Sequence, residues 1–264
     1  MVILLSLLRQ QSPYQHKNHQ LLQEFIDIAK EDLSKAYSSM KKRGTVMTNN
    51  LKSNTSKTRV LGMIGSLGPF IYIVATLTGG YLWTGYSHYS ETVSTLTSSG
   101  APNQAILTPL FAAYNICVLL LAVGLYIGIR NKGARVGSTL MALAGACGLL
   151  LFWFPQDFPQ GPPTTFTGTM HVAIAGIIAF ASLASVLEYG LSLRKNASWK
   201  TFARFCLIWF PIALMLGGFG AASITTAYAG LAERLSIGSI LVWIEIAGVF
   251  LFTRSKTLNP AKLT

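Results

Sequence analysis

The chain has 264 residues, of which 51% are hydrophobic and 11% are charged, and its formal net charge is +12. Soluble domains carry about 25% charged residues, so this composition indicates helices surrounded by lipid. The positive charge does not indicate a nucleic-acid partner, because the basic residues occupy an N-terminal segment and short gaps between apolar runs instead of one continuous patch.

The N-terminal segment, residues 1–58, differs in composition from the rest. Its stretch 19–40 places apolar side chains near helical spacing, which predicts an amphipathic helix on the membrane surface or against the bundle. Residues 41–59 are polar and basic, which predicts a flexible linker. An alternative interpretation is that Met47 is the natural start and that the first 46 residues belong to an over-extended gene.

Six apolar runs follow, and each is long enough to cross the hydrocarbon layer, which takes about 20 residues. They cover approximately 60–83, 107–129, 135–155, 168–192, 203–222 and 237–254. The sequence therefore predicts an all-α membrane bundle of six transmembrane helices over residues 59–256, followed by a short cytoplasmic tail at 257–264.

The connections between these runs alternate in charge. Residues 84–106 and 156–167 contain no Lys or Arg, and 223–236 contains only Arg234. The other ten basic residues beyond Arg59 fall on the opposite side, which is also the side of the basic N-terminal segment. Because positively charged loops stay in the cytoplasm, this alternation predicts that both termini are cytoplasmic.

Polar residues of the three outer connections form the candidate site. They are Ser90, Glu91, Asp157, His171, Glu233 and Arg234. Carboxylate and imidazole groups suit a metal or acid–base site, which would make the protein a membrane-embedded hydrolase, although the sequence has no HExxH or GxSxG motif and we assign no metal or cofactor. The same groups could instead line the pathway of a small transporter, or could form structural pairs that hold the loops on the bundle.

Single residues in these connections also have simpler structural interpretations. Glu233 and Arg234 would cap the start of the sixth run, where an acidic group is favourable near the positive end of a helix. Ser90 would act as a helix N-cap. His88 would be an exposed loop residue.

Glu245 is the charged group nearest to the middle of the bilayer. It lies about eight residues into the sixth apolar run, where a carboxylate costs about 2.5–3.5 kcal/mol. We therefore expect it to be protonated, or to pair with Tyr114, Asn115 or His171. In a transporter it would act as a proton or cation relay.

The order of the outer motifs resembles one known family. The motifs are Ser90-Glu91-Thr92-Val93-Ser94 with Gly100-Ala101-Pro102, then Phe154-Pro155-Gln156-Asp157, then Thr167-Gly168 with His171, then Gly230-Leu231 with Glu233-Arg234-Leu235. This pattern over residues 60–254 resembles the family catalogued as domain of unknown function 998, whose members are multi-pass proteins of prokaryotic cell membranes. The resemblance implies a location in the plasma membrane and leaves residues 1–58 outside the family region, and it carries no established activity.

We therefore expect the outer polar site to bind or handle a lipid headgroup or a small solute, with membrane lipids as partners. A distant similarity to eukaryotic six-helix proteins associated with lipid asymmetry and glycolipid-anchor remodelling points the same way, by analogy alone.

Overall fold

The computed structural model describes residues 13–257, which are helical apart from the connections between helices and contain no β-strand. The elements are α2 (Pro13–Leu82), the short 3-10 helix η1 (Ser94–Thr97), α3 (Gln104–Gly128), α4 (Lys132–Leu150), α5 (Phe166–Leu193), α6 (Lys200–Ala222) and α7 (Ala229–Thr257). The chain forms two compact units, which divide between Lys52 and Ser53. Each unit is described by itself.

In the first unit, the described residues belong to α2. Oppositely charged side chains one turn apart form ion pairs, with Lys30 Nζ 3.7 Å from Asp27 and Lys35 Nζ 2.6 Å from Glu31. Residues 41–59, which the sequence predicts to be a flexible linker, belong to the same helix. This stretch contains no proline, so a helix can continue through it from the turns on either side, although its Gly, Thr and Asn residues have low helix propensity. The amphipathic role of residues 19–40 stays a prediction.

The second unit confirms the six predicted spanning helices. Its spans are Thr55–Leu82, Gln104–Gly128, Lys132–Leu150, Phe166–Leu193, Lys200–Ala222 and Ala229–Arg254, the only such helices in the described residues. Their length and apolar composition make the chain a multi-pass membrane protein. The predicted start of the last span is wrong by eight residues, because α7 continues past the apolar run and contains Glu233 and Arg234 within its first turns.

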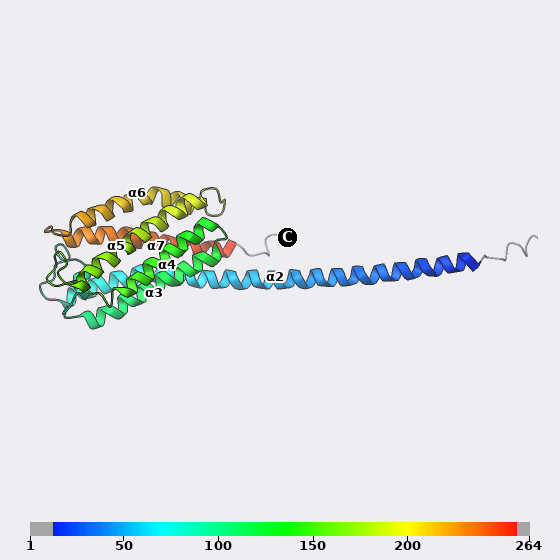
Figure 1. Ribbon diagram of the computed structural model, residues 1–264, viewed down its shortest axis with the longest axis horizontal. Coiled ribbons are helices and arrows are strands. Elements are labelled where there is room, and N and C mark those ends of the chain that lie inside the picture. The colour runs from blue at the N-terminus through cyan, green and yellow to red at the C-terminus, as the bar shows by residue number, and fades with distance from the viewer. Residues whose placement is uncertain (1–12, 258–264) are drawn as a thin grey trace, which may run out of the picture. The chain divides into compact units, whose positions relative to one another are not determined.

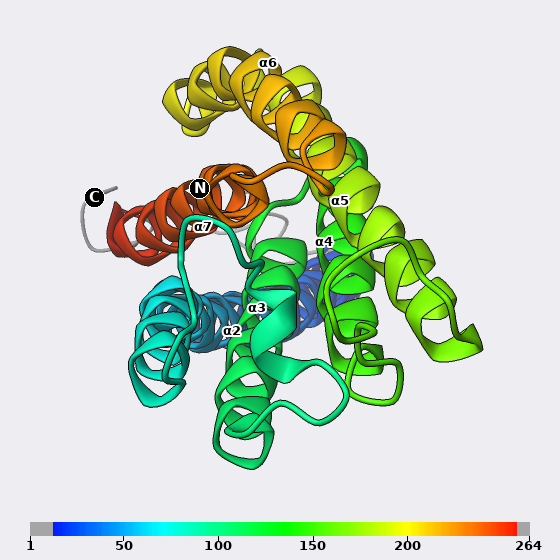
Figure 2. The same ribbon diagram turned by 90° about the vertical axis from the view of Figure 1, so that its left-hand side faces the viewer.

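Consecutive helices run antiparallel and pack side by side (Figure 1). The end-on view shows α3 between the spanning part of α2 and α4, while α6 lies at the opposite side of the bundle, beyond α5 and α7 (Figure 2). The spanning part of α2 packs against α3 and α7, since a Cβ placed on Gly65 would meet Leu121, and one on Gly62 would meet the backbone of Phe252 at 2.8 Å. Small residues permit this close approach of helix backbones in lipid.

Two opposite ends of the bundle differ in their connections. One end carries residues 83–103, 151–165 and 223–228, and is called the η1 end here because η1 lies in the first of these segments (Figure 1). The opposite end carries the short connections 129–131 and 194–199 with their flanking basic residues.

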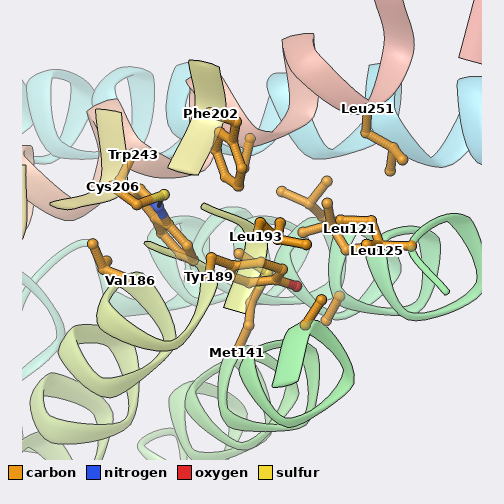
Figure 3. Packing of buried hydrophobic residues seen from close by; sticks show 14 of the residues in the cluster. Leu121, Leu125, Met141, Val186, Tyr189, Leu193, Phe202, Cys206, Trp243 and Leu251 are labelled. Atoms are coloured by element: carbon orange, nitrogen blue, oxygen red, sulfur yellow. Dashed lines mark hydrogen bonds between the residues drawn. The ribbon is translucent and has the colours of Figure 1, made fainter. Parts of the chain in front are cut away.

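The half of the bundle away from the η1 end is closely packed. Figure 3 shows buried side chains of α3 to α7 meeting there, among them Leu125, Met141, Tyr189, Phe202 and Trp243. Polar groups inside this core have partners. The Tyr189 hydroxyl lies 2.6 Å from Ser138 Oγ, and the Trp243 indole N–H donates to Cys206 Sγ at 3.3 Å. These contacts satisfy groups that would otherwise be costly in a dry interior.

Candidate functional site

Arg234 joins α7 to the first connection at the η1 end. Its Nη1 donates to the carbonyl oxygens of Glu91 at 2.7 Å and Gly230 at 2.9 Å. Its Nη2 donates to the Tyr86 hydroxyl at 2.6 Å and lies 3.0 Å from Nδ1 of His88. A planar guanidinium can serve four acceptors at once, which a lysine ammonium cannot do in this geometry. We call this set of contacts the Arg234 clamp.

The neighbouring side chain, Glu233, holds η1. Its carboxylate accepts a hydrogen bond from the backbone N–H of Val93 and another from Ser94 Oγ at 3.1 Å. Val93 directly precedes η1, so the carboxylate binds unsatisfied donors at the start of a helical turn. The sequence predicts that Glu233 caps its own helix. In the structure its carboxylate instead caps η1, which lies more than 130 residues earlier in the chain.

Glu91 and Gly230 bring the first connection into direct contact with α7. The Glu91 carboxylate accepts from the backbone N–H of Ser87 at 2.8 Å and closes a tight turn. A Cβ at Gly230 would lie 2.8 Å from the backbone N and C atoms of Glu91, and the adjacent Leu231 N–H donates to the Tyr89 carbonyl at 2.9 Å. Only glycine fits this close approach of two backbones.

Two glutamines of the second connection bind the first connection. Gln160 Oε1 accepts from the Thr92 N–H at 2.8 Å and from Thr95 Oγ1 at 3.0 Å, and the Gln156 carbonyl accepts from the Ser99 N–H at 3.1 Å. Neither glutamine was expected from the sequence to be a site residue. An uncharged amide gives no charge pattern that would distinguish it from other loop residues.

Asp157 organises its own connection instead of meeting the other acidic residues. Its carboxylate accepts from the backbone N–H and hydroxyl groups of Thr164 and Thr165, at 2.5–3.2 Å. The Thr165 side chain in turn accepts from the Gly168 N–H as the N-cap of α5. These hydrogen bonds, led by that from the Thr165 hydroxyl, lower the pKa of Asp157 to about 2, so the carboxylate is ionised at neutral pH.

His171 and Ser90 also have local partners. His171 is buried in the second turn of α5, and its Nδ1 lies 2.9 Å from the Phe154 carbonyl, which indicates that Nδ1 carries the proton. The Ser90 N–H points to Ser87 Oγ at 3.4 Å, and η1 has Val93 as its N-cap, so Ser90 is not the N-cap predicted from the sequence.

Glu245 is half-buried in α7 and faces α2. Ser66 of α2 lies beside its carboxylate, but the Ser66 hydroxyl makes no hydrogen bond of ordinary geometry among the described residues. Of the partners considered from the sequence, Asn115 donates to the Phe111 carbonyl and His171 contacts Phe154. The close packing of Gly62 and Gly248 brings the two helices together at this level.

A cavity of about 310 Å³ lies inside the half of the bundle nearer the η1 end. All six spanning helices contribute to its wall. Polar groups line it near the η1 end, including Ser94, Gln104, His171 and Glu233, whereas Val118 and Met141 lie at its deep end. Glu233 and Ile244 both line the wall and are eleven residues apart on α7, so the cavity is about 16 Å deep by the rise of an α-helix.

The candidate residues thus do not form a single site. Glu91, Glu233 and Arg234 meet where the first connection contacts α7, and Glu233 and His171 both line the cavity. Asp157 and Ser90 bind within their own connections, and Glu245 is absent from the described cavity wall. Residues 13–257 contain no group of three His, Cys, Asp or Glu side chains placed to hold a metal ion.

His88 gives the clamp a dependence on pH. Burial lowers the pKa of His88, and the adjacent positive charge of Arg234 lowers it further. Since the unfolded chain then binds the proton more readily, stability should fall as the pH falls from about 6.5 through the lower pKa of the folded state. We expect the melting temperature in detergent to fall between pH 7.5 and pH 5, and to fall less in His88→Gln. An equal fall in both proteins would contradict this role for His88.

The described residues define a class of protein, namely a multi-pass membrane protein whose six spanning helices enclose a cavity. The family model described as "Protein of unknown function (DUF998)" matches residues 66–249, and the chain belongs to this family. The match includes every candidate site residue from Ser90 to Glu245. No curated protein and no solved structure matches the chain.

Proposed function

We propose that the protein binds a single-chain amphiphile in the cavity nearer the η1 end. A membrane lipid with one hydrocarbon chain and a headgroup is an example. The observation that carries this proposal is the cavity itself, which is polar where it begins and apolar where it ends. Its volume falls at the lower end of the range of about 300–1,000 Å³ that is typical of small-molecule sites. Each methylene group buried in the deep end would contribute about 0.8 kcal/mol to binding.

The orientation of the chain favours a ligand that arrives from the outer leaflet of the cell membrane. The basic residues flank the connections at the opposite end of the bundle, so the positive-inside rule supports an outward-facing η1 end. Several wall residues of α5 and α6 are small, among them Ala175, Ala179, Ala213 and Gly217, and Ala179 is exposed on the bundle surface. A chain could therefore enter from the side, between α5 and α6.

The test is photo-crosslinking with an uncharged single-chain amphiphile that carries a diazirine at the end of its chain. In a bilayer, a bound probe should label Met141 and Trp243, which line the cavity and have only 2% and 1% of their surface exposed. Bilayer lipid cannot reach these two residues from outside the bundle.

A matched pair of substitutions on α5 provides the control. Ala175→Phe fills the cavity and should abolish the labelling of Met141 and Trp243. Ala173→Phe is the same change on the lipid-facing side of the helix, in a shallow surface groove with Phe180, and should leave that labelling intact. Labelling that is confined to exposed residues such as Phe180 and Met215 would refute the proposal.

A further inference from the structure

The charges on the cavity wall select a class of headgroup. Among the described residues of the wall, Glu233 is the single acidic residue, and no Lys or Arg lines the cavity. Arg234 is adjacent in the chain, but its guanidinium is held by Tyr86, His88 and the Glu91 carbonyl in the clamp. The wall therefore carries one carboxylate, and the positive charge of Arg234, which acts on that carboxylate, lies in the clamp and not on the wall.

The rest of the polar wall offers acceptors and aromatic faces. Because His171 Nδ1 is used on the Phe154 carbonyl, its Nε2 is left as an acceptor. Tyr72 lies edge-on to Phe111 and Tyr114, with ring centroids 5.1 and 4.9 Å apart, and all three rings line the cavity. The negative faces of aromatic rings attract ammonium groups.

Glu233 and the rings of Tyr72 and Tyr114 line the same cavity, so one ligand can contact them together. The hydroxyls of Tyr72 and Tyr114 have no hydrogen-bond partner among the described residues, so a ligand can contact them without breaking an existing bond. Glu233 itself is held in place by η1, which limits its movement toward or away from the cavity.

From this arrangement we infer that the amphiphile bound by the cavity has a cationic amine or ammonium headgroup, recognised by the Glu233 carboxylate and by the rings of Tyr72 and Tyr114. This inference rests on the proposed function. An ammonium group is attracted by both the carboxylate and the rings. A phosphate or sulfate would enter next to the carboxylate with no cation on the wall to bind it, and desolvating it there would be unfavourable.

The experiment uses three photoactivatable probes with the same chain and different headgroups: trimethylammonium, glucoside and sulfate. In bilayers containing the full-length protein, the ammonium probe should label Met141 and Trp243 at concentrations at least about tenfold lower than the sulfate probe. Glu233→Gln should remove this preference, measured as the ratio of ammonium to sulfate labelling in the same preparation.

Because Glu233 also holds η1, a second pair of variants separates recognition from folding. Tyr114→Leu removes a ring from the wall without changing the bonds of Glu233, and should weaken labelling by the ammonium probe several-fold. Tyr114→Phe keeps the ring and should have little effect. If all three probes label equally and Glu233→Gln changes nothing, the inference is overturned while the proposed function stands. If no probe labels Met141 or Trp243, both fail.

Discussion

Replacing Arg234 with methionine should lower the free energy of unfolding by about 3 kcal/mol. The substitution leaves four acceptors without their donor, two of them backbone carbonyls. Hydrogen bonds to charged groups contribute about 1.5–3 kcal/mol each, but several acceptors can recover partners from water, so the expected loss is smaller than the sum. Thermal or chemical unfolding of the purified protein in a mild detergent would measure it.

Two further variants make this result specific. Arg234→Lys keeps the charge but cannot reach acceptors on several sides, so it should lose most of the same stability. Arg130→Met removes an exposed basic residue at the opposite end of the bundle and should change the free energy by less than about 0.5 kcal/mol. A similar loss in Arg130→Met and Arg234→Met would show that the clamp contributes little.

Alanine at Gly230 should destabilise the protein by about 2–4 kcal/mol, the cost of overpacking against a backbone that cannot yield easily. The new methyl group would overlap the backbone of Glu91, which is fixed by its bonds to Ser87 and Arg234. Relief would require α7 and the first connection to separate, which lengthens the hydrogen bonds of the clamp. The melting temperature should fall, and the tryptophan fluorescence of the folded state should change with the altered packing.

Gly238 in the same helix is the matched control. A Cβ at Gly238 would have no other heavy atom within 4 Å. Since alanine restricts the unfolded chain more than glycine does, Gly238→Ala should leave stability unchanged or raise it by up to about 1 kcal/mol. The two substitutions are chemically identical, so an equal effect at both positions would contradict the close contact between Gly230 and Glu91.

The number of helices could be predicted from the sequence because hydropathy over a span of membrane length depends on local composition alone. The start of α7 could not be predicted from composition in this way. Glu233 and Arg234 interrupt the apolar run, and only their partners in a distant connection make a helical, partly buried position favourable for them. The helical conformation of residues 41–59 was not expected for a different reason, since polar composition alone does not distinguish a helix from a linker.

The candidate site shows the same division. The rarity of charge in the outer connections was sufficient to select Glu91, Glu233 and Arg234, which the structure brings together. Their main partners could not be found in this way, because most are backbone groups, which every residue has. The cavity has no motif of its own. It results from where small residues of several helices, such as Ala144 and Ala175, face one another.

The Arg234 clamp also sets an order on the maturation of the protein. Its acceptors at residues 86–91 leave the ribosome early, whereas its donor belongs to the last of the six spanning helices. Because chains are made from the N-terminus, the first connection must wait for the sixth helix to be inserted before it reaches its final conformation. Formation of the clamp thus requires that α7 has been inserted. A chain truncated before Arg234 would expose an unsatisfied loop and a half-open bundle to the cell's quality control.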